Sequence, residues 1–250
     1  MCGRYASVKD PGRLAVEFDA FDATGEDAPG PDHNVAPTDP VYGVVQRHPR
    51  DAEGVRDLSR TERSVRVMRW GLVPKWAKDP SVGNRMINAR VETVTSKPAF
   101  RTAIKYHRCL LPAEGWFEWR RDGRRKQPFF MTYGDGSSLA LAAIWATWRQ
   151  AGSEGPPLVS CSVLTTGAAE PLTEIHDRMP LVMPAARWEQ WLDPEREDVS
   201  ALLEPSPELI ADLELRPVST AVNDVRNDGP ELLERVDDRS AEPAAVPLDE

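Results

Sequence analysis

Apolar and polar residues alternate with a period of two in short runs along most of the chain, which is typical of β-strands. Such runs occupy residues 41–46, 65–72, 108–119, 127–133, 138–148, 159–166 and 213–219. Helical periodicity is scarcer. One helix is predicted where Asp10-Pro11 supplies a cap and a first-turn proline before an apolar face made of Leu14, Phe18 and Phe21. Short helices are expected after Ser96 and at 184–192 and 199–203.

Two stretches interrupt this pattern. Residues 47–63 are charged and hold few large apolar side chains, which predicts a solvated hairpin tip or variable loop. The last twenty residues carry 7 acids, 2 bases and two prolines, so we expect the tail, residues 229–250, to be disordered. The remaining 1–228 should form one domain, because a chain of 250 residues with 40% hydrophobic content can bury one sizeable core.

Charge is distributed unevenly along the chain. The net charge is -9, but residues 63–126 hold 16 Lys and Arg against 5 Asp and Glu, a local charge of +11. The rest of the chain therefore carries -20. The basic segment is either a phosphate-binding face or a region whose charges pair with the acidic remainder, and composition leaves both open.

Composition also argues against several classes of protein. No apolar run resembles a signal peptide or approaches the ~20 residues of a membrane span, so a cytoplasmic protein is expected. Cys2, Cys109 and Cys161 lie far apart, which favours reduced thiols over disulfides or a zinc site. The sequence has no P-loop, GxGxxG or metal-ligand spacing. We expect chemistry by side chains alone, without cofactor or metal.

The first residues, Met1-Cys2-Gly3-Arg4, suggest what that chemistry is. Removal of the initiator Met is easiest before a small residue, so the mature chain should begin with Cys2 and carry a 1,2-aminothiol. Its amine and thiol ordinarily titrate near ~8 and ~8.5, so both nucleophiles should be accessible near neutral pH without large pKa shifts. The amine can form an imine with an aldehyde, and the thiol can then close a thiazolidine. A Cys at position 2 also arises by chance.

Four further polar positions are candidates, each with a plain structural alternative. Asn88 and Arg90 share one face of an extended segment with Glu92, either in a cleft or facing solvent. Glu118 lies among aromatic residues on a strand, where lost hydration suits a carboxylate to proton transfer unless it simply pairs with an arginine. His176 lies in a constrained polar loop, where most histidines are merely solvated.

Trp76 lies in a loop beyond Pro74 and beside Lys75 and Lys78. An indole among cations is typical of a surface on which a base or sugar stacks. A half-buried Trp that closes the rim of the fold is the alternative.

Six motifs occur here in the order seen in one protein family. They are Met1-Cys2-Gly3-Arg4-Tyr5, Asn34-Val35-Ala36-Pro37, Trp70-Gly71-Leu72-Val73-Pro74, Ile87-Asn88-Ala89-Arg90-Val91-Glu92, Gly115-Trp116-Phe117-Glu118-Trp119 and Ile175-His176-Asp177-Arg178-Met179-Pro180. The sequence resembles the SRAP family, named for SOS-response-associated peptidase, over residues 1 to 228 apart from the charged loop. The resemblance implies a predominantly antiparallel, barrel-like α+β fold with short peripheral helices and with Cys2 in a central cleft.

The resemblance also implies an activity. Cys2 would attack the ring-opened aldehyde of an abasic site in single-stranded DNA and form a thiazolidine cross-link that shields the lesion in the DNA damage (SOS) response. Glu118 and His176 would move protons, and Asn88 would orient the reacting groups. Release of Met1 by a peptidase activity and an abasic-site lyase activity are further implied possibilities.

The DNA contacts that the resemblance implies come from six residues: Arg4, Asn34, Pro37, Trp76, Arg90 and Arg178. The three arginines would hold phosphates and Trp76 would support a stacked nucleotide. The protein would be a monomer in the cytoplasm, associated with the nucleoid when bound to DNA.

Two other functions compete with this one. Class II glutamine amidotransferases also begin Met-Cys-Gly, but an apolar residue and a further Gly usually follow, whereas Arg4-Tyr5 follow here, and 250 residues leave no room for a synthase domain. A module that binds single-stranded DNA without covalent chemistry would use Trp76 and the arginines alone. Its binding would be reversed by salt and would not depend on Cys2.

Overall fold

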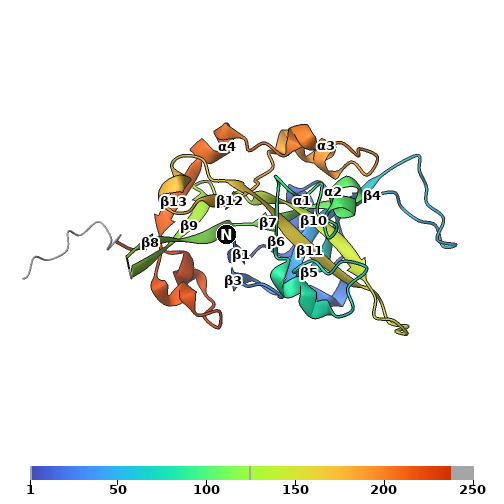
Figure 1. Cartoon of the computed structure of the whole chain (residues 1–250), viewed down its shortest axis with the longest axis horizontal. Helices are drawn as coiled ribbons and strands as arrows, with labels where there is room; N and C mark the ends of the chain where they lie inside the picture. The colour runs from blue at the N-terminus through green and yellow to red at the C-terminus, as the bar shows by residue number, and fades with distance from the viewer. Residues whose placement is uncertain (1, 124, 238–250) are drawn as a thin grey trace, which may run out of the picture.

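The structure, a computed structural model, describes residues 2–123 and 125–237 and consists mainly of two β-sheets (Figure 1). The smaller sheet has the strand order β13-β9-β8-β1-β3. Its strands are β1 (Tyr5–Ser7), β3 (Asp32–Val35), β8 (Gly115–Asp122), β9 (Arg125–Tyr133) and β13 (Leu213–Pro217). The neighbours along this order whose pairing is described are all antiparallel.

The larger sheet has the order β12-β11-β10-β7-β4-β5-β2, with β6 beside β11. Its strands are β2 (Phe21–Asp22), β4 (Pro40–Arg47), β5 (Glu62–Trp70), β6 (Asn88–Arg90), β7 (Arg108–Ala113), β10 (Leu139–Trp148), β11 (Leu158–Gly167) and β12 (Arg178–Pro180). A parallel pairing of β11 with β5, with Cys161 opposite Trp70, closes five of these strands into a barrel. The antiparallel, barrel-like α+β architecture is confirmed.

The described residues form four short α-helices: α1 (Pro11–Glu17), α2 (Arg101–Tyr106), α3 (Trp188–Leu192) and α4 (Pro207–Ala211). The two faces of the barrel strands serve different cores. On β4, Val41 and Val45 belong to the cluster that contains Cys2, whereas Val44 packs with residues of α1 and α2. In the part of the chain that is described, no helix has the length and apolarity needed to cross a membrane.

The helices are shorter than the sequence pattern predicts. The first ends at Glu17 because Asp19 adopts a positive φ of 48°, and Phe21 is 47% exposed at the start of β2 rather than part of the helix. The helix expected after Ser96 begins only at Arg101. The strands β1, β3 and β12 were not predicted, since three or four residues show no clear alternation.

The expected disorder of the tail does not hold for residues 229–237. Leu232 is buried, Val236 donates a backbone hydrogen bond to Pro217 (2.9 Å), and Arg235 pairs with Glu214 on β13 (2.6 Å). This segment is therefore part of the folded unit. Residues 238–250 lie outside the described residues.

Strand β1 fixes the N-terminal residues against β8. Tyr5 lies opposite Trp116, and the amide of Phe117 donates to the carbonyl of Arg4 (2.9 Å). Close packing of β8 on β9 requires Gly115, where a Cβ atom would lie 2.3 Å from the carbonyl oxygen of Met131. This pairing brings Cys2 to the strand that carries Glu118.

Candidate active site

Cys2 lies at 0% exposure in the same cluster as Tyr5, Trp70 and Trp116. Its backbone is held from the opposite side by Asn88, whose Nδ2 donates to the carbonyl oxygen of Cys2 (2.7 Å). Asn88 is placed by the parallel pairing of β6 with β11, opposite Val163. The predicted association of Asn88 with Cys2 therefore appears as a direct contact.

The other end of the Asn88 amide is an available acceptor. Its Oδ1 is buried and has no hydrogen-bond partner among the described residues. A buried acceptor without a partner costs free energy. It is suited to accept a hydrogen bond from an amine or hydroxyl group that enters beside Cys2.

Glu118 shares the strand face that carries Trp116. Trp116 belongs to the core cluster of Cys2, whereas Phe117 belongs to a separate cluster on the opposite face. The alternation read from the sequence therefore places Glu118 on the correct side. Its carboxylate is 5% exposed and lies close enough to Cys2 to raise the pKa of the thiol.

His176 faces Glu118, with its Nε2 3.9 Å from Oε1 of the carboxylate. Its Nδ1 has two neighbours with opposite requirements. The amide of Arg178 donates to Nδ1 (3.0 Å), which suits the neutral ring, and Oδ1 of Asp177 lies 2.9 Å away, where it would accept a proton from the charged ring. Nδ1 of His176 therefore has both a hydrogen-bond donor and an acceptor beside it.

One expectation for Cys2 is wrong. Burial, and secondly the negative charge of Glu118, raise the pKa of its thiol well above the ordinary value. The sequence could not show this, since Glu118 is distant along the chain. The resting thiol is therefore protonated at neutral pH, and it needs a base when it reacts.

The three buried thiols predict a loss of stability in alkali. Burial raises the pKa of Cys2, Cys109 and Cys161 above the ~8.5 of an unfolded chain. Above that pH the unfolded state releases protons that the folded state keeps, so the free energy of unfolding should fall by up to about 1.4 kcal/mol per pH unit for each thiol. Urea unfolding with a reductant, at pH values below and above ~8.5, measures the slope.

In the variant Cys161→Ala the free energy of unfolding should fall less steeply with pH, because one of the three buried thiols is gone. This difference in slope does not depend on the stability of the variant at neutral pH. An unchanged slope would contradict the assignment of this pH dependence to the buried thiols.

An open pocket of about 640 Å³ leads to the Glu118–His176 pair. The other residues that line it are Trp119, Arg121, Lys126 and Asn223. The sequence reasoning did not single out these four. A signal existed for two of them, because the β8–β9 hairpin places Arg121 opposite Lys126 and so brings two cations together.

Two predicted DNA-binding residues, Arg4 and Asn34, contact each other. Nη1 of Arg4 donates to Oδ1 of Asn34 (2.7 Å) and to the carbonyl of Val222 (2.9 Å). Asn34 is 2% exposed, and its Nδ2 donates to the carbonyls of Asp224 (3.0 Å) and Asn227 (2.9 Å). Asn34 is thus buried beneath the loop 221–227, to which it is hydrogen-bonded, and does not lie at the surface.

Pro37 and Trp76 lie in loops at the surface. Pro37 is half-buried in the turn between β3 and β4, and Thr38 after it has a positive φ of 85°. Trp76 is 61% exposed in the segment after β5. Its indole is therefore accessible to a ligand. The alternative, a half-buried Trp76 that closes the rim of the fold, does not hold.

Arg90 and Arg178 differ in their surroundings. Arg90 is exposed at the end of β6. Arg178 donates to both carboxylate oxygens of Glu92 and, through Nη2, to the carbonyl of Thr165 (2.6 Å). These bonds lower the pKa of Glu92. A phosphate would therefore have to compete with Glu92 for this guanidinium.

The basic segment 63–126 does not form a single face. Arg108 is buried and donates to carbonyls near the ends of α2 and α3, including those of Ile104 (2.9 Å) and Trp191 (2.6 Å). Arg63 pairs with Glu189 (2.9 Å). Arg63 thus pairs with the acidic remainder of the chain, whereas Arg108 satisfies carbonyl groups near two helix ends.

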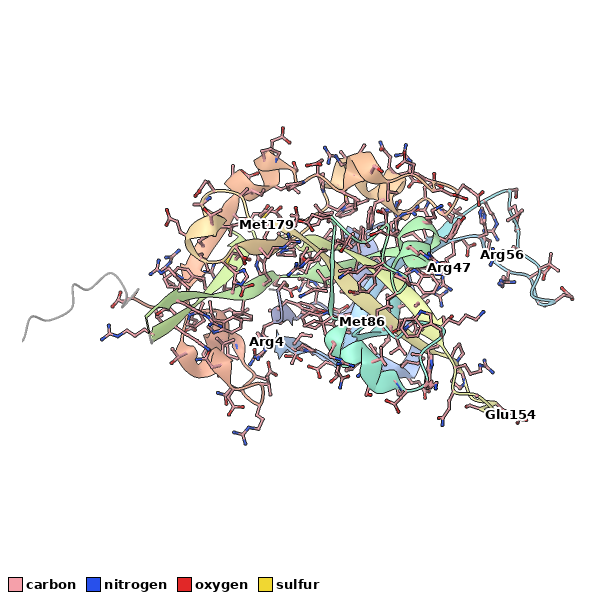
Figure 2. The ribbon with its side chains drawn as sticks, in the orientation of Figure 1. Arg4, Arg47, Arg56, Met86, Glu154 and Met179 are labelled. Carbon is pink, nitrogen blue, oxygen red and sulfur yellow. The ribbon has the colours of Figure 1, made fainter. Side chains whose placement is uncertain are left out.

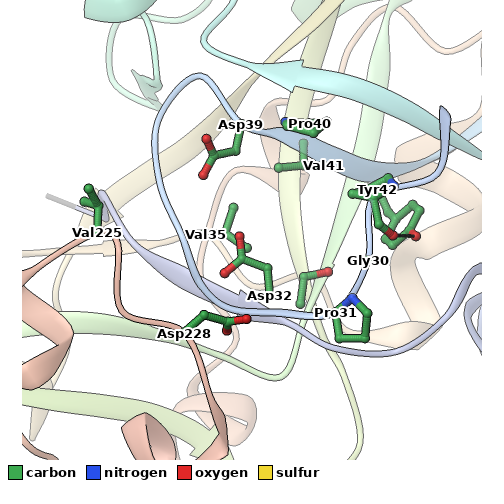
Figure 3. A pocket seen from close by; sticks show the side chains of 12 residues that line it. Gly30, Pro31, Asp32, Val35, Asp39, Pro40, Val41, Tyr42, Val225 and Asp228 are labelled. Carbon is green, nitrogen blue, oxygen red and sulfur yellow. Dashed lines mark hydrogen bonds between the residues drawn. The ribbon is translucent and has the colours of Figure 1, made fainter.

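Beside Arg4, a second pocket of about 290 Å³ is lined by carboxylates (Figure 3). Asp32, Asp39 and Asp228 all face it. Burial raises the pKa of Asp32, and the charges of Asp228 and Asp39 raise it further. Three carboxylates in its wall make this pocket unfavourable for a phosphate.

Comparisons with known proteins identify relatives of this chain. The chain is 33% identical over 238 residues to YoqW of Bacillus subtilis, covering 94% of this chain and 99% of that protein. It is 31% identical over 250 residues to YedK of Escherichia coli, covering 94% and 100%. Both relatives are named abasic site processing proteins.

A solved structure of a protein from Bacteroides thetaiotaomicron has the same fold, with a TM-score of 0.75 and 22% identity over 94% of this chain and 100% of that one. The sequence profile described as "SOS response associated peptidase (SRAP)" matches residues 1–225. The profile spans the barrel, the Cys2 site and the loop that Asn34 holds. The chain therefore belongs to the SRAP family.

Proposed function

We propose that this protein processes abasic sites in single-stranded DNA by forming a covalent thiazolidine cross-link through Cys2 after Met1 is removed. The observation that carries the proposal is the convergence of Cys2, Asn88, Glu118 and His176 from four separate segments. An aminothiol beside a carboxylate and an imidazole is suited to condense with an aldehyde. The names of the relatives supply the abasic site as the source of that aldehyde.

The reaction proceeds in two bond-forming steps. The α-amine of Cys2 adds to the aldehyde carbon of the ring-opened sugar, and loss of one water gives an imine. The thiol sulfur then adds to the same carbon, and its proton passes to the imine nitrogen. Glu118 is placed to take the proton from the thiol, and His176 relays protons between the pocket and Glu118.

The imine forms before the thiol adds, because the thiol sulfur attacks the imine carbon. A protonated thiol leaves the amine to react first, and the thiol reacts once Glu118 accepts its proton. Asn88 holds the Cys2 carbonyl and offers Oδ1 to the amine or to the sugar hydroxyl. Cys2 has no exposed surface in the chain that still begins with Met1, so the site has to open before a lesion can reach the sulfur.

The DNA backbone would follow the cations around the pocket. We assign phosphate contacts to Arg90, Arg178, Arg121 and Lys126, and base stacking to the exposed Trp76. Asn34 acts in this proposal by fixing Arg4 and the loop 221–227. Pro37 shapes the neighbouring turn.

The ion pair between Glu92 and Arg178 predicts opposite effects of two substitutions. Glu92→Gln should free the guanidinium for phosphate and tighten binding to single-stranded DNA, whereas Arg178→Gln should weaken it and reduce the slope of log K against log salt by about 0.7. Fluorescence anisotropy over a range of salt concentrations measures both. Equal weakening by the two variants would show that the pair acts only as a structural unit.

Two secondary activities belong to the same proposal. An imine that the thiol fails to capture acidifies the neighbouring sugar carbon, so strand cleavage by β-elimination is the expected side reaction. The family description names a peptidase without its substrate, and release of Met1 is the cleavage that this proposal uses. The proposal needs Met1 to be removed but not by the protein itself.

Mixing the protein with single-stranded DNA that contains one abasic site tests the proposal. A band that survives denaturation and needs the lesion is the expected result. Binding that is lost on denaturation and is equal for undamaged DNA would instead identify a non-covalent DNA-binding module.

A further inference from the structure

The barrel has a second mouth, at the end of β4 away from the active site. Val45 lies in the barrel interior with Cys2. Arg47 lies on the same face of β4 as Val45, because alternate residues of a strand share a face. Trp145 ends the interior row of β10 at the same level. β4 has eight residues, so its two ends lie roughly 23 Å apart. Figure 2 shows Arg47 and Arg56 far to one side of Arg4.

Arg47 has an unusual environment at this mouth. Its Cζ lies 4.0 Å from the centroid of the Trp145 ring, and the His107 ring lies 4.5 Å from the same indole. Its Nε is buried without a hydrogen-bond partner, and no ion pair within the described ranges involves it. An acceptor from outside the chain would satisfy this donor.

Further arginines surround Arg47. A pocket of about 300 Å³ is lined by Arg47, Arg50 and Arg66 together with His48 and Phe21. Arg56 pairs with Arg50 through a β-bridge in the adjoining loop. Burial lowers the pKa of Arg47 to about 10, and the nearby charges of Arg66, Arg50 and Arg56 act in the same direction. Arg47 stays charged at neutral pH within a cluster of like charges.

The carboxylates near this cluster are already engaged. Glu62 also lines the pocket, but it forms an ion pair with Arg60. Glu195 pairs with His48 (2.8 Å). Ser64, also in the wall, accepts from Nε of Arg66 (3.0 Å) and so orients that side chain. The mouth therefore keeps an excess of positive charge.

We propose that this far mouth of the barrel, formed by Arg47, Arg50 and Arg66, is a phosphate-binding site for a nucleotide unit, separate from the Cys2 site. Guanidinium groups match the paired oxygens of a phosphate. The exposed ring of Phe21 in the wall supplies a surface for the attached base or sugar. The nucleotide belongs either to a DNA strand that reaches past the lesion or to a free mononucleotide.

Thermal unfolding tests the site with inorganic phosphate and with a deoxynucleoside monophosphate, at constant ionic strength and with chloride as reference. At about five times the dissociation constant, wild type should gain roughly 2–4 °C in Tm. Arg66→Gln and Arg50→Gln should each lose most of this gain, and Arg66→Lys should recover part of it. Arg13→Gln, which removes an exposed arginine from α1, is the matched control and should keep the gain.

Undamaged single-stranded DNA distinguishes the two sources. If the ligand is a DNA strand, Arg66→Gln should reduce the slope of log K against log salt by about 0.7 for each lost contact when the oligonucleotide is long. With a short oligonucleotide the slope should not change. If the ligand is a free nucleotide, the variants should lose the Tm gain. Their slopes of log K against log salt should equal those of wild type for both the long and the short oligonucleotide. Absence of a Tm gain in wild type, together with unchanged slopes in every variant, overturns the proposal. No lesion is present, so the outcome does not depend on cross-linking.

Discussion

The variant Cys2→Ala should form no cross-link that survives denaturation, while it cleaves DNA at the abasic site more than wild type does. Its α-amine can still form the imine, but no thiol captures it. The imine then persists as a reversible species that either hydrolyses or undergoes β-elimination. Adduct and cleaved strand can be counted together on one denaturing gel.

Borohydride separates the two species chemically. It should trap the Cys2→Ala protein on DNA by reducing the imine, whereas the wild-type adduct should need no reductant. Cys109→Ala and Cys161→Ala are matched controls, because both remove a fully buried thiol from the barrel. They should cross-link as wild type does. A stable adduct from Cys2→Ala without reductant would refute the thiazolidine.

Glu118→Gln should slow cross-linking by about 10²–10⁴-fold, the usual loss when a positioned acid–base group is removed. Two effects of this substitution oppose each other. Without the carboxylate the pKa of Cys2 is less elevated, which makes the thiol easier to ionise, but the base that takes its proton is lost. The expected slowing means that proton transfer dominates. The single-turnover rate of adduct formation, measured over a range of pH, tests this.

Glu114→Gln provides the control for Glu118→Gln. Glu114 is a half-buried carboxylate that directly precedes β8, and it accepts a hydrogen bond from the amide of Val8 (2.8 Å) outside the pocket. It should leave the rate unchanged. His176→Gln should slow the reaction and change its pH profile, since the relay to Glu118 is lost. A Glu118→Gln rate equal to or above that of wild type would remove Glu118 from the mechanism.

Local pattern predicted much of the fold, and the motifs predicted the centre of the site. Alternation placed Glu118 on the face of Trp116, and the runs 108–119 and 127–133 correspond to strands of the barrel and of the smaller sheet. The barrel strands were found because each is long enough to show a period of two. Their closure through β11 and β5 was not visible, because it joins residues about ninety positions apart.

The surroundings of the predicted residues were less accessible to sequence reasoning. Nothing local shows that Arg178 meets Glu92, that Asn34 is buried under the loop 221–227, or that Glu118 raises the pKa of Cys2. Each depends on tertiary contacts between distant segments. Residues 229–237 were expected to be disordered from composition, yet the burial of Leu232 holds them to the fold.

The intact mass of the denatured adduct tests the central claim most directly. With single-stranded DNA that carries one abasic site, the thiazolidine predicts the mass of the chain without Met1 plus that of the DNA minus one water. The adduct should be absent when the lesion is absent. A chain verified to begin at Cys2 that yields no adduct, or an adduct of any other mass, would contradict the account.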